Sequence, residues 1–178
     1  MRYFLSGGSK SGKSMLAQRL ARDMAKDAPL YYIATMIPKD EEDRARIRRH
    51  RQERDGWGFT TVEAGGDLPG ALQDCDPAGS FLLDSVTAWL TNLMFPPDGR
   101  IDETAPERAA RELEQLCARC PNLVIVSDDL YSDARQYDPW TERYRVGLAR
   151  ICRRAVALCD AAVEVTAGVP VVHKGELP

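Results

Sequence analysis

Hydrophobic residues along this chain gather in short runs that alternate with longer segments of helical periodicity. The runs that predict strands cover residues 3–6, 30–34, 59–63, 81–84, 123–126, 162–166 and 169–173. After the first run, Leu16, Leu20 and Met24 recur every four residues, as in a helix with one apolar face. Further helices are expected over residues 39–54, 68–73 and 85–95, from 104 to about 118, and from 140 to about 158. Strands that alternate with helices predict an α/β fold in which helices cover both faces of a mostly parallel sheet.

The last two apolar runs are separated by Ala167-Gly168, a turn sequence that predicts a β-hairpin at the end of the fold. Residues 123–126 are apolar throughout, which is typical of a strand buried in the middle of a parallel sheet. The sequence shows no internal repeat, low-complexity segment or linker. We therefore expect residues 1–178 to form a single domain.

Composition and charge narrow the functional class. A chain of 178 residues is long enough to bury a sizeable core, and its net charge of −3 gives no reason to expect nucleic acid or an anionic membrane as a partner. No apolar run approaches the roughly 20 residues of a membrane span. The chain starts directly with a strand, without a basic and then apolar leader, from which we expect a cytoplasmic protein.

The five cysteines are scattered, at positions 75, 117, 120, 152 and 159. Cys117 and Cys120 form a C-x-x-C pair, but no second pair with zinc-site spacing follows. The pair also lies near the end of a predicted helix, whereas a reactive thiol of low pKa is expected at a helix start. Ordinary reduced cysteines are the better interpretation.

The first strand leads into a phosphate-binding loop. Residues 7–14 fit the pattern G-x-x-x-x-G-K-[ST], with Gly7, Gly12, Lys13 and Ser14 at the fixed positions. In this motif glycines let backbone N–H groups surround a phosphate, the lysine contacts the β- and γ-phosphates, and the serine hydroxyl binds Mg²⁺. A glycine-rich surface turn is the alternative, but a strand before the loop and a helix after it favour nucleoside triphosphate binding.

The apolar strand 81–84 ends in an acid. Asp84 follows three apolar residues, the arrangement of a Walker-B motif, in which the carboxylate meets the Mg²⁺ held by the loop serine. An acid that only ends a strand is the alternative. The sequence predicts Ser14 and Asp84 as the metal ligands.

The segment 39–54 is unusually polar. Six arginines (Arg44, Arg46, Arg48, Arg49, Arg51 and Arg54) surround His50, and Ile47 is the one strongly apolar side chain. On a helix Arg46, His50 and Arg54 lie four residues apart and share a face that suits an anion such as triphosphate. A solvated charged helix without catalytic function is the alternative.

Several other residues are candidates at the edge of the sheet. Asp128 and Asp129 follow the buried strand 123–126, and one of them is expected to contact the second substrate or the metal. Tyr131, Trp140 and Tyr144 form either an apolar wall or part of a helix core. We interpret His173, in the last strand, as structural.

Taken together, these motifs resemble those of the bifunctional adenosylcobinamide kinase/adenosylcobinamide-phosphate guanylyltransferases of cobalamin biosynthesis, nearly from end to end. The resemblance rests on residues 7–14, 32–35, 46–51 and 61–63, and most specifically on Leu82-Leu83-Asp84-Ser85-Val86-Thr87-Ala88-Trp89-Leu90-Thr91-Asn92-Leu93. It implies a RecA-like P-loop fold and a homotrimer. It also implies Mg²⁺, GTP and ATP as cofactor and nucleotide substrates.

The resemblance implies two reactions. A nucleoside triphosphate first phosphorylates the aminopropanol hydroxyl of adenosylcobinamide, and GMP is then transferred from GTP through a histidine to give adenosylcobinamide-GDP. His50 is the implied GMP acceptor, and Lys13 is the second catalytic residue. The implied nucleotide-binding residues are Gly7, Gly8, Ser9, Lys10, Ser11, Gly12, Lys13, Ser14, Ala34, Thr35, Met36, Arg51, Gln52, Glu53, Arg54, Glu63 and Asp84.

The chain departs from the family pattern at several positions. Some relatives carry two adjacent histidines, and Arg49 occupies the first of these positions here. The family sequence Asn-Glu-Val-Gly is replaced by residues 128–131, and Ala149, Cys152 and Asp55 replace a glycine, an asparagine and a proline. Two further functions therefore stay open: a P-loop kinase of another small alcohol, and a nucleotide-binding regulatory protein without turnover.

Overall fold

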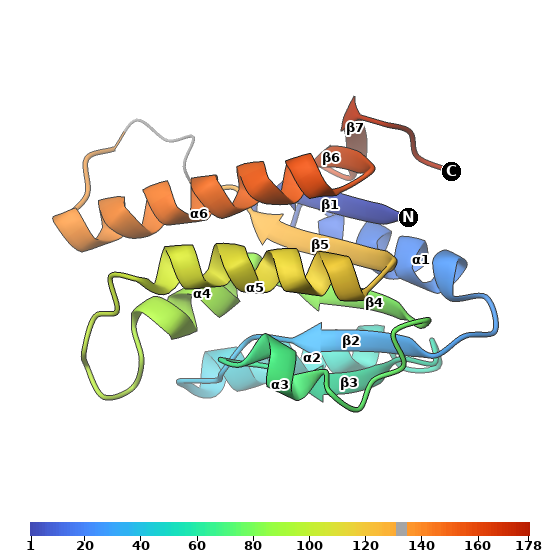
Figure 1. The fold of residues 1–178 in the computed structure, drawn as a ribbon, viewed down its shortest axis with the longest axis horizontal. Coiled ribbons are helices and arrows are strands. Elements are labelled where there is room, and N and C mark those ends of the chain that lie inside the picture. Colours follow the sequence, from blue (N-terminus) through green and yellow to red (C-terminus); the bar gives the residue numbers. More distant parts are fainter. Residues whose placement is uncertain (131–134) are drawn as a thin grey trace.

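The computed structural model describes residues 1–130 and 135–178 and contains one seven-stranded sheet between two layers of helices (Figure 1). The strands are β1 (Arg2–Gly7), β2 (Leu30–Ala34), β3 (Thr60–Glu63), β4 (Ser80–Asp84), β5 (Asn122–Asp128), β6 (Ala161–Thr166) and β7 (Val169–Lys174). Their order across the sheet is β3-β2-β4-β5-β1-β6-β7. All neighbouring pairs are parallel except β6 and β7, which are antiparallel and form the predicted hairpin.

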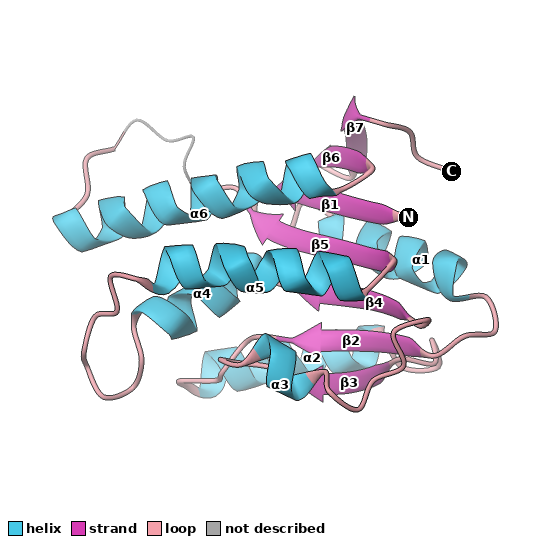
Figure 2. Ribbon diagram, in the orientation of Figure 1, coloured by secondary structure: helices cyan, strands magenta, loops and turns pink. Residues whose placement is uncertain are grey.

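The helices lie on both sides of the sheet, as the alternation of elements predicts. They are α1 (Lys13–Ala25), α2 (Glu41–Glu53), α3 (Leu68–Ala71), α4 (Val86–Met94), α5 (Ala105–Arg119) and α6 (Pro139–Leu158). Figure 2 shows α1 and α2 behind the sheet and α3, α4, α5 and α6 in front of it. The structure therefore confirms the mostly parallel α/β fold.

Two hydrophobic cores lie between the sheet and its two helix layers, one on each face of the sheet. One contains Leu20 of α1 with Leu5, Leu82 and Val126 on one face of the sheet. The other contains Trp89, Leu113 and Ile151 of α4, α5 and α6 against the opposite face. Since side chains on a strand point alternately to the two faces, the central strands are buried on both sides, which explains their continuous apolar runs. Among the described residues, no helix is both long and apolar enough to cross a membrane.

The cysteines are free thiols, and four of them are buried. Burial raises the pKa of the Cys117 thiol to about 11 and the pKa values of the Cys120 and Cys159 thiols to about 12. A raised pKa keeps the thiol protonated and unreactive at neutral pH. This agrees with the interpretation of Cys117 and Cys120 as ordinary reduced cysteines.

We expect the buried thiols to make the fold sensitive to alkali. The folded protein retains thiol protons that the unfolded chain releases above about pH 9, so the free energy of unfolding should fall as the pH rises from about 9 towards 12. Urea unfolding in reductant at about pH 8 and about pH 10.5 measures this loss. Cys120→Ala should flatten the dependence, and equal free energies of unfolding of the wild type at both pH values would contradict the expectation.

Candidate functional site

The predicted phosphate loop connects β1 to α1 at the carboxyl edge of the sheet. Gly12 precedes α1 with a φ of 94°, a left-handed backbone conformation that favours glycine. A Cβ atom on Gly7 would clash with the carbonyl oxygen of Val165 in β6. The backbone N–H of Gly168 donates a hydrogen bond of 2.8 Å to the carbonyl of Ser11, so the C-terminal hairpin supports the loop from one side. The strand, loop and helix that the motif requires are all present.

Lys13, the lysine of the loop, is nearly buried and forms an ion pair with an aspartate. Its Nζ lies 2.6 Å from Oδ1 of Asp128 and donates a hydrogen bond of 3.0 Å to the carbonyl of Gly8. Asp128 is the last residue of β5 and pairs in register with Gly7. The ammonium group is thus held beside the phosphate loop by a carboxylate from the neighbouring strand.

The parallel register gathers three predicted site residues in one row. Ala34 of β2 pairs with Glu63 of β3 on one side and with Asp84 of β4 on the other. The Tyr32 hydroxyl donates a hydrogen bond of 2.7 Å to Oδ2 of Asp84. Burial, followed by the charge of Asp84, raises the pKa of Tyr32 well above its ordinary value, so the hydroxyl stays protonated at neutral pH and remains a donor. The sequence analysis gave Tyr32 no role of its own.

Helix α2 forms without a buried face. None of its 13 residues, all of which the structure describes, is buried. The Asp40 carboxylate caps the helix by accepting a hydrogen bond of 2.9 Å from the N–H of Asp43. The first turn is acidic and the last turn carries His50 and Arg51, an arrangement that complements the helix dipole. Local capping and charge therefore stabilise this helix more than packing does.

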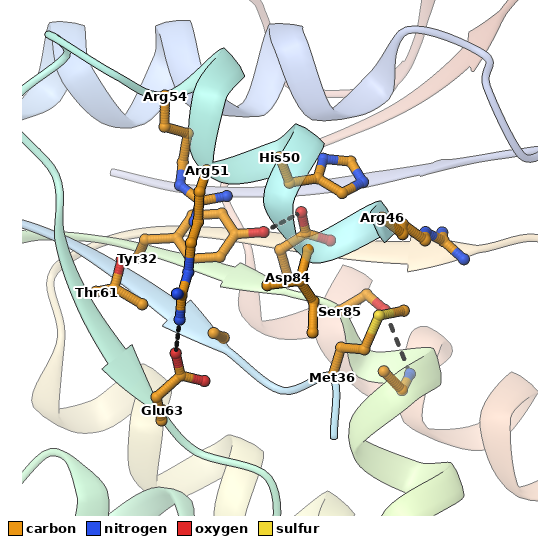
Figure 3. Close-up of a pocket in the computed structure, with 13 residues that line it drawn as sticks. Tyr32, Met36, Arg46, His50, Arg51, Arg54, Thr61, Glu63, Asp84 and Ser85 are labelled. Carbon is orange, nitrogen blue, oxygen red and sulfur yellow. Dashed lines mark hydrogen bonds and ion pairs between the residues drawn. The ribbon is translucent and has the colours of Figure 1, made fainter. Parts of the chain in front are cut away.

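Two arginines connect the end of α2 to the sheet (Figure 3). The guanidinium of Arg54 lies over the Tyr32 ring, 3.4 Å from its centroid, and its Nη1 atom is buried with no hydrogen-bond partner among the described residues. Arg51 donates a hydrogen bond of 2.9 Å to Oε1 of Glu63, and both side chains are exposed. A buried guanidinium nitrogen without a partner suits an anion or a carbonyl of a ligand.

These residues surround a cavity with an empty volume of about 520 Å³ between α2 and the carboxyl ends of β2, β3 and β4. Its walls combine apolar side chains with arginines, one histidine and two carboxylates. The lining residues are Tyr32, Ala34, Met36, Arg46, Ile47, His50, Arg51, Arg54, Thr61, Glu63, Asp84, Ser85 and Ala88. A mixed lining of this kind can hold a nucleobase, with apolar side chains against the ring and polar groups at its edge.

A larger cleft of about 1600 Å³ lies between the phosphate loop and the other flank of α2. Residues 9–14 of the loop line one side of the cleft. The other side is lined by residues 42, 43, 45, 46, 49, 50 and 53 of α2. Arg46 and His50 line both the cavity and the cleft. The arginine-rich helix, which the sequence also allowed to be a purely solvated element, thus faces the phosphate loop across an open space.

His50 lies at the junction of these two spaces. Its side chain is 26% exposed. Its Nδ1 atom lies 3.3 Å from Oε2 of Glu53 on the same helix, but this atom is buried and forms no hydrogen bond with the described residues. The burial of Nδ1 favours Nε2 as the ring nitrogen that acts as a base, nucleophile or ligand. The geometry therefore allows His50 to contact a group that spans the cavity and the cleft.

The predicted metal ligands fit Mg²⁺ by their chemistry, since both offer oxygen atoms and Mg²⁺ prefers oxygen ligands. Ser14 follows the loop and Asp84 ends β4, but β5 lies between β1 and β4, so the two strand axes are about 10 Å apart. Neither side chain is buried completely. Among the described residues, no group of three or more His, Cys, Asp or Glu side chains is arranged to hold a metal ion. Nucleotide phosphates and water would have to complete the coordination.

Some predicted site residues have other partners in this structure. Thr35 is buried, donates a hydrogen bond to the Ser85 carbonyl and accepts one from the Ser85 N–H, both 2.8 Å long, so its side chain joins β2 to β4. Asn92 of α4 donates to the carbonyls of Thr35 and Gly65, at 2.7 and 2.9 Å. Gln52 and Glu53 are exposed on α2. The roles of Thr35, Gln52 and Glu53 in nucleotide binding stay predictions.

The remaining candidates divide between core and surface. Tyr144 is in the core and donates a hydrogen bond of 3.0 Å to the Thr87 carbonyl, whereas Trp140 is 41% exposed. Tyr131 lies outside the described residues. Nε2 of His173 is 3.0 Å from Oε2 of Glu164 on the neighbouring strand, in agreement with a structural role.

Comparison with known proteins gives a consistent family match. The family described as cobinamide kinase / cobinamide phosphate guanyltransferase matches residues 3–173. The bifunctional adenosylcobalamin biosynthesis protein CobP of Pseudomonas aeruginosa is 33% identical over 178 residues, which cover 99% of both chains. CobU of Salmonella typhimurium, which has the same description, is 30% identical over 185 residues, covering 98% of this chain and 100% of the relative.

Solved structures are similar in fold. The flagellar accessory protein FlaH of Methanocaldococcus jannaschii has a TM-score of 0.53 at 11% identity, with 98% of this chain and 78% of that chain covered. The KaiC-like protein PH0186 of Pyrococcus horikoshii has a TM-score of 0.52 at 11% identity, with 98% and 79% covered. At this level of identity the likeness concerns the fold alone.

Proposed function

The chain belongs to the cobinamide kinase / cobinamide phosphate guanyltransferase family, a family of transferases, and we propose that it carries out both reactions of that description on adenosylcobinamide. In the first reaction a nucleoside triphosphate phosphorylates the aminopropanol hydroxyl. In the second, GTP supplies GMP to the phosphorylated corrinoid. One observation carries the proposal most directly: a complete phosphate loop faces an arginine-rich helix with a single histidine across one cleft.

The phosphate loop supports the kinase reaction. Its N–H groups and Lys13 would bind the β- and γ-phosphates, and the Ser14 hydroxyl and the Asp84 carboxylate would hold Mg²⁺. Bound there, the cation would neutralise charge that develops on the phosphate oxygens. The hydroxyl oxygen of the substrate attacks the γ-phosphorus, the bond from the γ-phosphorus to the β-phosphate oxygen breaks, and the nucleoside diphosphate leaves. The hydroxyl proton is released to the solvent.

Helix α2 supports the guanylyl transfer. We assign the GMP acceptor to Nε2 of His50, because Nδ1 is buried. This nitrogen attacks the α-phosphorus of GTP, and pyrophosphate leaves. A phosphate oxygen of the phosphorylated corrinoid then attacks the same phosphorus, the P–N bond breaks, and the imidazole is restored. Splitting the transfer into two displacements is the usual advantage of a covalent intermediate.

The 520 Å³ cavity is the proposed site for the guanine base. Its polar lining includes the Glu63 carboxylate and the unpartnered Nη1 of Arg54, while Ala34, Met36 and Ile47 provide apolar surface. A guanine ring presents both donors and a carbonyl acceptor, so a carboxylate and a guanidinium can bind different edges of it.

A second candidate function is a kinase that does not transfer GMP. Arg49, at the position where some relatives carry a histidine, lines the cleft opposite the phosphate loop. If the acceptor function requires a histidine at that position, the protein would phosphorylate its substrate but would not transfer GMP to it.

Transfer of label from γ-labelled ATP or GTP to adenosylcobinamide tests the proposed kinase reaction. We expect label on the corrinoid that requires Mg²⁺ and both substrates. A different small alcohol that accepts the label while adenosylcobinamide does not would contradict the proposed substrate. Label that appears only as free phosphate would contradict transfer to an alcohol.

The resemblance also supports a homotrimer in the cytoplasm. Sedimentation equilibrium tests the oligomeric state, for which a molar mass three times the 19.8 kDa of the chain is expected. A monomer at all concentrations tested would contradict it.

A further inference from the structure

Arg46 of α2 lies beside His50, and the proposed reactions assign it no function so far. Both residues line the cavity of about 520 Å³ and the cleft of about 1600 Å³. They are four residues apart in α2, so their Cβ atoms lie about 5–6 Å apart on one face of the helix. Figure 3 shows both side chains extending from α2 in the neighbourhood of Asp84. A group that contacts His50 is therefore within reach of the Arg46 guanidinium.

Arg46 differs from neighbouring arginines of α2 in having no carboxylate partner. Arg44 and Arg48 each have a guanidinium nitrogen 3.8 Å from an oxygen of Glu41, and Arg51 binds Glu63. Within residues 1–130 and 135–178, no acid forms an ion pair with Arg46, whose side chain is exposed. Its guanidinium is thus available to an anionic ligand, and binding that ligand breaks no ion pair of the fold.

The two spaces locate the phosphates of bound GTP. In the proposed function the base occupies the cavity, and the loop with Lys13 binds the β- and γ-phosphates in the cleft. The α-phosphate connects these groups, so it lies where the cavity and the cleft meet, beside His50. Lys13 acts on the outer phosphates, which become the leaving pyrophosphate. The α-phosphate itself therefore needs another cation, and Arg46 is at the same junction.

Building on the proposed guanylyl transfer, we propose that Arg46 is a catalytic residue that binds the α-phosphate of GTP and stabilises the transition state at its phosphorus. The electron pair of Nε2 of His50 forms the P–N bond, and the bond from the α-phosphorus to the bridging oxygen breaks. Its electron pair leaves with pyrophosphate, and the imidazole keeps its proton on Nδ1. The guanidinium donates hydrogen bonds to the nonbridging α-oxygens, in the paired geometry that suits a phosphate.

The same contact serves the second displacement. A phosphate oxygen of the phosphorylated corrinoid attacks the phosphorus of the bound GMP, and the electron pair of the P–N bond returns to His50. Two anionic phosphates approach each other in this step, and a cation between them reduces their repulsion. Arg46 remains next to the phosphorus throughout, because it is on the same helix face as the histidine that carries it.

The test measures Arg46→Gln in three assays. The maximal rate of GMP attachment from α-labelled GTP should fall by about 10²–10³-fold, since a preorganised donor at the reacting phosphate is lost. The Kd of α,β-methylene-GTP, which cannot release pyrophosphate, should rise less than about tenfold, because the contact strengthens in the transition state. Phosphoryl transfer to adenosylcobinamide should lose at least about tenfold less than GMP attachment does.

Three results would overturn the proposal. A loss of GMP attachment below about tenfold would show that Arg46 does not stabilise this transition state. A Kd of α,β-methylene-GTP that rises by the same factor as the rate falls would indicate binding of the nucleotide without catalysis. An equal loss of phosphoryl transfer would assign Arg46 to the γ-phosphate instead.

Arg44→Gln is the matched control, because it removes the same charge from α2 at a residue that lines neither the cavity nor the cleft. We expect its GMP attachment to stay within about threefold of the wild type. An equal loss in Arg44→Gln and Arg46→Gln would show that only the total charge of the helix matters. Arg46→Lys keeps the charge without the paired donors, so its rate should lie between those of Arg46→Gln and the wild type. A rate no higher than that of Arg46→Gln would contradict stabilisation by charge.

These outcomes are distinct from failure of the proposed function. A wild-type protein that binds GTP but acquires no GMP would contradict both the proposed guanylyl transfer and the role of Arg46. A wild-type protein and an Arg46→Gln variant that acquire GMP at equal rates would contradict the role of Arg46 alone.

Discussion

Replacement of Lys13 by alanine is expected to abolish both phosphoryl and guanylyl transfer. Lys13 is the cation that the phosphate loop directs at the β- and γ-phosphates, and it is held beside the loop by Gly8 and Asp128. Loss of one preorganised charge at a transferring phosphate typically lowers kcat by about 10²–10³-fold or more. Initial rates of γ-phosphate transfer to adenosylcobinamide measure the first effect, and incorporation of GMP into protein measures the second.

The same substitution leaves the Asp128 carboxylate without its partner. Because Asp128 is still 19% exposed, water can solvate it, and we expect a loss of roughly 1–3 kcal/mol in the free energy of unfolding. The matched control is Lys26→Ala, which removes an exposed lysine just beyond the end of α1. Activity of Lys13→Ala within tenfold of this control would contradict the assignment of the phosphate loop.

Replacement of His50 by alanine is expected to eliminate the covalent attachment of GMP and to leave the kinase reaction within about threefold of the wild type. His50 lies between the cavity and the cleft, so its loss removes the nucleophile but not the phosphate loop. Incubation with Mg²⁺ and α-labelled GTP measures the attachment. Label that survives base and is released by acid indicates a phosphoramidate.

Two further variants make this measurement specific. His173→Ala removes the other histidine, which lies on β7 beside Glu164, and should be labelled like the wild type. Arg49→His restores the pair of adjacent histidines found in some relatives. Strong labelling of Arg49→His, together with an unlabelled wild type that binds GTP, would transfer the acceptor role to position 49 and contradict our assignment of His50.

The secondary structure could be predicted closely because each element carries a local signal. The phosphate loop, the apolar strands and the turn before β7 all depend on residues that are neighbours in the sequence. Helix α2 has no apolar face, and the Asp40 cap and the acidic first turn that stabilise it in the structure are also local features of the chain. These signals do not depend on the tertiary fold.

The order of the strands has no such local signal. Residues 81–84 end in Asp84, and Asp128 follows two residues after the run 123–126. Nothing in the amino-acid sequence places Asp128 nearer to the loop than Asp84. That placement follows from the position of β5 between β1 and β4, which is set by packing against α1 and α4. The same limit explains why the bond from Tyr32 to Asp84 was not foreseen, since it joins residues 52 positions apart.

The position of α2 relative to the phosphate loop also could not be predicted from the sequence. Its composition allowed an anion-binding face or a solvated charged surface. The helix is exposed and faces the phosphate loop, and its binding of an anion stays a prediction. The hydrogen bonds of Thr35 also needed the structure. Its buried side chain bonds to Ser85, and the nucleotide contact that the resemblance implies for Thr35 stays a prediction.

The mass of the corrinoid product tests the central claim most directly. Wild-type protein is incubated with adenosylcobinamide, ATP, GTP and Mg²⁺. The corrinoid is then isolated, and its molecular mass is measured by mass spectrometry. Two sequential transfers on one chain predict a product that carries GDP on the aminopropanol oxygen. A product that stops at the monophosphate, with GTP present in excess, would contradict the bifunctional assignment and leave a kinase.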